Sequence, residues 1–187
     1  MDVSDLSLPD MIFVTPRGET PAFPDLAPPD RALRVIALDL GPRHAPGFWA
    51  LQLDQAIRDL ARPSIVVARG VAALAFAHWA LLSPRVYLAG IAGAILVSPR
   101  EAPKPLQALA ATLAIGPIVP LSFPSIVVTD MRSGSLPDTL TLATRWGSQL
   151  IDRGAQALCD IFRREDDSGF DPAQLAVAAL APAGIAA

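Results

Sequence analysis

The segment Ser64–Trp79 reads SIVVARGVAALAFAHW and contains a complete strand–turn–helix unit. Its first part, Ser64–Ala68, is a short β-branched run, which is typical of a buried strand. Residues 71–82 follow, rich in Ala and Leu and free of Gly and Pro, and this composition favours a helix. Only Arg69 and Gly70 separate the two elements. A buried strand that turns at once into an apolar helix predicts a sheet with helices packed on it.

The same alternation of strand and helix runs through the rest of the chain. We expect strands over 11–15, 34–40, 64–68, 92–97, 125–129 and 149–151, and helices over 48–61, 71–82, 105–114, 137–146 and 172–180. This order predicts a doubly wound, mostly parallel sheet of about six strands with right-handed crossovers. We therefore expect one three-layer α/β domain over residues 1–187, with its core at about 11–180 and a frayed tail at 181–187.

The residues around the turn resemble a known family. Val67–Ala80, VARGVAALAFAHWA, is similar position by position to V-A-H-S-L-G-C-L-A-V-A-H-W-A, the strand, elbow and helix of small single-domain α/β serine hydrolases of the retinoblastoma-binding-protein type and their bacterial relatives. Leu121–Thr129 resembles the strand that leads to the family's catalytic Asp, and Ser168–Phe170 resembles a late S-G-F. The resemblance implies an α/β-hydrolase-like fold with a nucleophile elbow at residues 69–71.

The resemblance also implies that the catalytic residues are lost. Gly70 stands at the position of the nucleophilic Ser, and Arg132-Ser133-Gly134-Ser135 stands where the family has a loop with Asp. The family's His falls at Leu158 or Arg163. Because a triad needs a nucleophile, a base and an orienting acid, the resemblance predicts a pseudoenzyme without catalytic residues.

Arginines follow every predicted strand. They are Arg17, Arg43, Arg69, Arg100, Arg132 and Arg153. Ligands of open α/β sheets bind beyond the carboxyl ends of the strands, and the planar guanidinium suits carboxylate and phosphate. We therefore predict an anion site made by Arg69, Gly70, Val71, Arg17 and Arg132. The alternative is that these arginines form ordinary solvated pairs with nearby acids, namely Asp39, Glu101, Asp130 and Asp152.

The bulk composition narrows the function further. The net charge of −3 gives no reason to expect nucleic-acid binding, and the acidic start of the chain argues against a secretion signal. The longest apolar run, 70–82, is too short to span a membrane. One cysteine, Cys159, fits a reducing compartment, and two isolated histidines, His44 and His78, make no metal cluster. We expect a cytoplasmic protein without metal or cofactor.

Three functions remain open from the sequence. The leading hypothesis is a non-catalytic descendant of a serine hydrolase that binds a protein partner or a small anionic ligand. The second is an active hydrolase of carboxylic esters or amides with displaced residues, for which Ser98, Ser133 and Ser135 are candidates. The third is a structural subunit of a homo-oligomer or of a complex with an active paralogue.

Overall fold

The computed structural model describes residues 10–21, 34–129 and 136–152. In this part of the chain the strands are β1 (Asp10–Pro16), β2 (Arg34–Leu38), β3 (Ser64–Arg69), β4 (Ile91–Val97), β5 (Ser125–Thr129) and β6 (Gln149–Asp152). The α-helices are α1 (Phe48–Arg58), α2 (Val71–Leu82), α3 (Gln107–Ala114) and α4 (Leu136–Trp146), and the 3₁₀ turns are η3 (Arg85–Gly90) and η4 (Lys104–Leu106).

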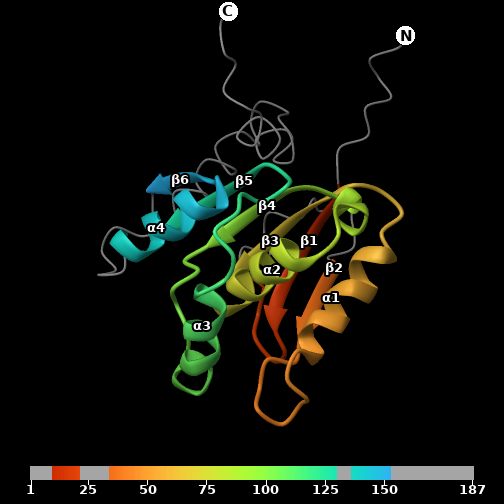
Figure 1. The fold of residues 1–187 in the computed structure, drawn as a ribbon. Coiled ribbons are helices and arrows are strands. Elements are labelled where there is room, and N and C mark those ends of the chain that lie inside the picture. Colours follow the sequence, from red (N-terminus) through yellow and green to blue (C-terminus); the bar gives the residue numbers. More distant parts are fainter. Residues whose placement is uncertain (1–9, 22–33, 130–135, 153–187) are drawn as a thin grey trace, which may run out of the picture.

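The strands form one six-stranded sheet in the order β2-β1-β3-β4-β5-β6, and every neighbouring pair is parallel. The chain moves outward from β1 to β2, then returns and adds β3 to β6 on the other side of β1 (Figure 1). The predicted doubly wound α/β sheet is therefore confirmed. Its winding direction reverses between β1 and β3, and such switch points are where α/β folds bind ligands.

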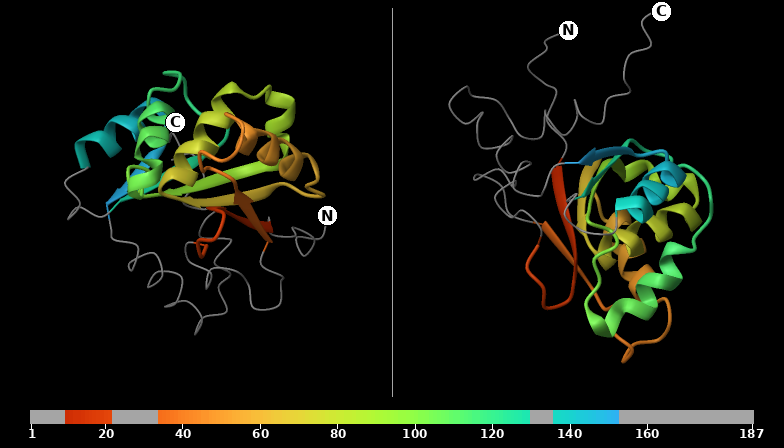
Figure 2. Two further views of the ribbon diagram at one scale, coloured as in Figure 1. Left: turned by 90° about the horizontal axis from the view of Figure 1, so that it is seen from below. Right: turned by 90° about the vertical axis from the view of Figure 1, so that its left-hand side faces the viewer.

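The described helices α1, α2, α3 and α4 all lie on one side of the sheet (Figure 2). Beneath them is the larger part of the core, in which Leu53, Phe76 and Leu96 are completely buried. The opposite side of the sheet is buried too, with Phe13 and Val67 each 1% exposed. The side chains on both faces of the sheet are thus buried, as is usual for a parallel sheet. The helix predicted over 172–180 and the tail lie outside the described residues.

Three predicted boundaries need correction by more than one residue, each for its own reason. Strand β2 ends at Leu38 because the N–H of Asp39 bonds to the side chain of Gln52, at 2.8 Å, and leaves the sheet. Helix α1 ends at Arg58 because the next residues form a tighter turn, with Leu60 N–H bonded to Ile57. The helix predicted over 105–114 begins as the 3₁₀ turn η4 and becomes α-helical at Gln107. The turn η3 was not predicted.

Candidate functional site

The strand–turn–helix unit has the predicted geometry. β3 ends at Arg69, Gly70 makes the whole turn with φ +57° and ψ −132°, and α2 begins at Val71. Three backbone hydrogen bonds fix the turn: Gly70 N–H donates to Val97 O at 2.9 Å, and Gly70 O accepts from Ala73 N–H at 3.0 Å and from Leu74 N–H at 3.3 Å. A residue with a side chain rarely adopts this backbone conformation, and a nucleophile elbow is a place where it does so under strain. The turn has the backbone shape of an elbow, with Gly70 at its apex.

The space that a nucleophile would need is already filled. A Cβ built on Gly70 would lie 2.6 Å from the backbone oxygen of Glu101 and 3.6 Å from its carbonyl carbon. Atoms held this close overlap, and a backbone carbonyl cannot rotate away as a flexible side chain can. The fold therefore accepts only Gly at this position unless the chain around Glu101 moves.

The segment after β4 holds the Glu101 carbonyl in place. Ser98 has φ +42°, an unusual conformation for a residue with a side chain. Its N–H donates to Val128 O at 2.7 Å and its carbonyl accepts from Glu101 N–H at 2.9 Å, which closes a turn that passes over the elbow. On the other side, the Arg69 guanidinium binds the Glu101 carboxylate at 2.9 Å. Ser98 thus shapes the turn, and both the backbone and the side chain of Glu101 contact the elbow.

A cleft of about 820 Å³ opens at the elbow, at the switch point between β1 and β3. Its walls come from the ends of β1 and β3, the start of α2 and the segment after β4. The charged residues that line it are Glu19, Arg69, Arg100 and Glu101, two of each sign. The formal charges of these side chains cancel, so this cleft is polar without being a net positive surface.

Three of the strand-end arginines have carboxylate partners in the structure. Arg69 pairs with Glu101, Arg100 pairs with Asp138 at 3.2 Å, and Arg17 binds both oxygens of Asp39. The side chains of Arg69 and Glu101 are 59% and 46% exposed, and such exposed pairs contribute little stability. Arg17 and Arg69 thus form the ordinary ion pairs that the alternative interpretation expected. The anion site stays a prediction.

The Arg17–Asp39 pair belongs to a network outside the elbow cleft. Arg17 lines a second pocket, of about 420 Å³, together with Asp39 and His44. Gln52 Nε2 also donates to Asp39, at 2.6 Å. The hydrogen bonds from Arg17 hold the pKa of the Asp39 carboxyl below its ordinary 3.8 against partial desolvation, with smaller contributions from Gln52 and His44. The same pairing raises the pKa of Arg17.

The predicted site residues thus lie in different parts of the molecule. Arg69, Gly70 and Val71 meet in the elbow cleft, Arg17 lines the neighbouring pocket, and Arg132 lies outside the described residues. The same holds for the candidate nucleophiles Ser133 and Ser135 and for the positions of the family's acid and base. Sequence reasoning missed the Glu101 carbonyl, because no sequence signal marks a backbone contact.

The two histidines lie away from the elbow cleft. His44 is exposed and stacks on Phe48 with ring centroids 5.5 Å apart, whereas His78 is half-buried in α2. Within the described ranges there is no group of three or more His, Cys, Asp or Glu that could hold a metal ion. In the described part of the chain, no helix has the length and hydrophobicity of a membrane span.

The parallel sheet in this order, with an elbow between β3 and α2, is typical of α/β-hydrolase-like folds. The family model described as serine hydrolase matches residues 31–176, and the chain belongs to that family. Among solved structures, the fold is similar to that of a protein described as a YdeN-like hydrolase from Pectobacterium atrosepticum. The identity is 21%, the TM-score is 0.52, and the match covers 78% of this chain and 76% of that one. No curated protein matches the chain.

Proposed function

We propose that this chain is a pseudoenzyme of the serine hydrolase family, of the retinoblastoma-binding-protein type, that binds a ligand at the elbow cleft without cleaving it. One observation carries the proposal: Gly70 occupies the nucleophile position, and the Glu101 carbonyl occupies the space of a nucleophile's Cβ. Acyl-enzyme formation requires an oxygen or sulfur at this point to attack the substrate. The elbow offers no such atom.

The ligand that best suits the cleft is a small anion such as a carboxylate or phosphate. Arg69 contributes a guanidinium, and the amides at the start of α2 lie beside it. The anion would take the place of the Glu101 carboxylate on Arg69. Because that pair is exposed and contributes little stability, this exchange is energetically feasible.

A pair of measurements tests the loss of catalysis. A fluorophosphonate probe should not label the protein, and turnover of p-nitrophenyl acetate should not exceed that of a catalytically inert protein at the same concentration. Stoichiometric labelling at any Ser would instead show an active hydrolase with a displaced nucleophile.

Ligand binding is tested separately by thermal shift and calorimetry. Phosphate, sulfate, nucleotides and acyl carboxylates are screened at low ionic strength against wild type, Arg69→Ala and the control Arg85→Ala, an arginine outside the cleft. An anion at about a hundred times its Kd adds about 2.7 kcal/mol of stability, and added salt should weaken this effect. Arg85→Ala should respond like wild type and Arg69→Ala should not. If no anion raises the melting temperature, or if Arg69→Ala responds like wild type, the cleft does not bind anions through Arg69.

A further inference from the structure

A third cavity lies between α1, α2 and η3, and it shares no lining residue with the elbow cleft or with the pocket beside Arg17. We call it the aromatic pocket, because Trp49, His78, Trp79 and Tyr87 line it. Its volume is about 420 Å³, which falls within the range of small-molecule sites. Asp54 from α1 is the one residue with a formal charge in its lining. The pocket thus combines several aromatic rings with a single carboxylate.

The walls of the pocket are held in place by packing and by one hydrogen bond. Trp79 Nε1 donates to Asp54 Oδ1 at 2.8 Å, which links α2 to α1 and orients the carboxylate. The rings of Trp49 and His78 meet edge to face, with centroids 6.4 Å apart. Trp49 and Trp79 are 8% and 4% exposed, so most of each indole is fixed in the core. A ligand would therefore meet a preformed surface.

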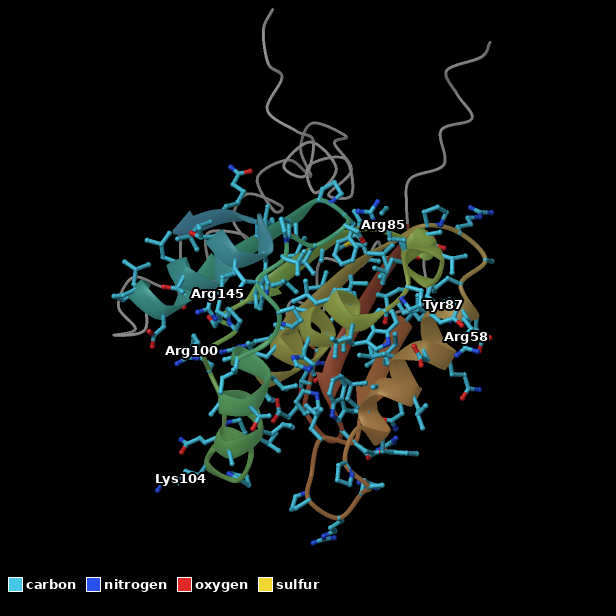
Figure 3. All side chains as sticks on the ribbon, viewed as in Figure 1. Arg58, Arg85, Tyr87, Arg100, Lys104 and Arg145 are labelled. Atoms are coloured by element: carbon cyan, nitrogen blue, oxygen red, sulfur yellow. The ribbon has the colours of Figure 1, made fainter. Side chains whose placement is uncertain are left out.

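The second carboxylate oxygen of Asp54, Oδ2, has a more distant partner than Oδ1. Among the residues that the structure describes, Asp54 Oδ2 has the Arg58 guanidinium at 3.8 Å, a distance too long for a hydrogen bond. The same guanidinium lies over the Tyr87 ring, 5.2 Å from its centroid. Figure 3 shows Arg58 and Tyr87 side by side, with Arg85 at the same end of the molecule and Arg100 and Lys104 at the other. This corner already holds one cation against an aromatic ring and a carboxylate.

We propose that the aromatic pocket binds a small organic ammonium ion, with its charge near Asp54 and its alkyl groups against the aromatic rings. Cations are attracted to the face of an aromatic ring, and Tyr87, 40% exposed, is the most exposed ring of the pocket. This attraction grows when the cation is poorly hydrated. A metal ion keeps its water and finds a single carboxylate here, whereas an anion is repelled by Asp54. A neutral ligand of the same shape gains the apolar contacts but leaves the carboxylate without a counter-charge.

Arg58 competes with such a ligand. Its side chain is 57% exposed, so its contacts with Asp54 and Tyr87 are weak and exchange readily. Replacing it with a neutral residue removes a cation from the place that the ligand's charge would take. The proposal therefore predicts that Arg58→Gln binds the ammonium ion more tightly than wild type, by about threefold or more.

The test is a titration with choline chloride, followed by the NMR signals of the indole N–H groups. The chain has three tryptophans, and the third, Trp146 in α4, does not line the pocket and serves as an internal reference. The size-matched neutral control is 3,3-dimethylbutan-1-ol, and sodium chloride at equal ionic strength controls for salt. Variants are Asp54→Asn, which keeps the acceptor for Trp79 but removes the charge, Tyr87→Leu and Arg58→Gln.

Choline should shift the signals of Trp49 and Trp79 in a saturable manner and leave Trp146 unchanged. Asp54→Asn should weaken binding by about fivefold or more, Tyr87→Leu should also weaken it, and the neutral alcohol should bind less tightly than choline. The proposal is overturned if choline gives no saturable shift, if the neutral alcohol binds equally well, or if Arg58→Gln weakens binding. Because Arg58 is exposed, Arg58→Gln keeps the test decisive even if another variant fails to fold.

Discussion

Replacing Gly70 with Ser tests whether the elbow has the space for a nucleophile. Gly70 has φ +57°, and a side chain in such a conformation costs about 1–3 kcal/mol. The new Cβ would also lie 2.6 Å from Glu101 O, whereas ordinary contacts begin at 3.4 Å. The two atoms must therefore separate by 0.8 Å, the difference between these distances. Strain of this kind in a packed region adds about 1–3 kcal/mol.

The two effects together predict that Gly70→Ser loses about 2–6 kcal/mol of stability. For a chain of this length such a loss lowers the melting temperature by about 4–24 °C. The matched control is Gly18→Ser: Gly18 has φ +86°, but a Cβ there meets no atom within 4 Å. The control carries the backbone penalty alone, so the difference between the two variants isolates the contact with Glu101. Calorimetric melting of both variants and wild type measures this difference.

The same variant is assayed for esterase activity. A Ser hydroxyl without a base is a poor nucleophile, and the base contributes about 10²–10⁴-fold to such chemistry. We therefore expect no turnover of p-nitrophenyl acetate above wild type. Equal stability of Gly70→Ser and Gly18→Ser would refute the contact with Glu101. Clear esterase activity of Gly70→Ser would show that a base lies within reach of the elbow.

Three further predictions concern acid stability, the core and reactivity. Since the pKa of Asp39 is lowered in the folded protein, its contribution to stability is present above the ordinary value of 3.8 and is lost as the pH falls below it. Urea unfolding of Asp39→Asn should therefore show a shallower loss of stability at acid pH than wild type does; parallel curves would contradict this. On α1, Leu53→Ala should lower the free energy of unfolding by about 2–5 kcal/mol because Leu53 is fully buried. Leu51→Ala, at a position 63% exposed, should change it by about 0.5 kcal/mol or less. Similar values for the two variants would contradict the burial of this face of α1. Fluorophosphonate labelling should stay absent after Arg69→Ala, because opening the Arg69–Glu101 pair exposes no nucleophile; labelling of the variant alone would reveal one hidden beneath the pair.

The alternation of elements determined the fold class from the sequence alone. Buried parallel strands are continuous β-branched runs, and SIVVA and SIVVT mark β3 and β5 without a periodic pattern. The helix over 71–82 was predicted to the residue, because Gly70 precedes it and Ser83-Pro84 follows it. The predicted end of β2 was wrong because a side chain from another segment, Gln52, binds the backbone of Asp39. The boundaries of α1 and α3 were wrong because tighter turns adjoin these helices.

The sequence by itself also determined the most consequential chemical fact, that Gly70 stands at the elbow. A residue type is visible in the sequence, and a Gly supplies no nucleophile in any fold. The sequence could further show that an Arg follows each strand, and it named Asp39 and Glu101 among the acids available to them. It could not decide between an anion site and ordinary pairs, because that choice depends on distances across the edge of the sheet.

Only the tertiary structure decided what surrounds the elbow. The Glu101 carbonyl comes within contact distance of Gly70 because β4 lies beside β3, and the unusual backbone of Ser98 turns the next residues over the elbow. The side chains give no sign of this contact, because it involves the backbone oxygen of Glu101 and a residue that is distant in the sequence, Gly70. The aromatic pocket has the same origin: Asp54 and Tyr87 become neighbours of Trp79 only when α1, α2 and η3 pack together. Local residue patterns fix helices and strands, whereas the contents of a cleft depend on how those elements pack.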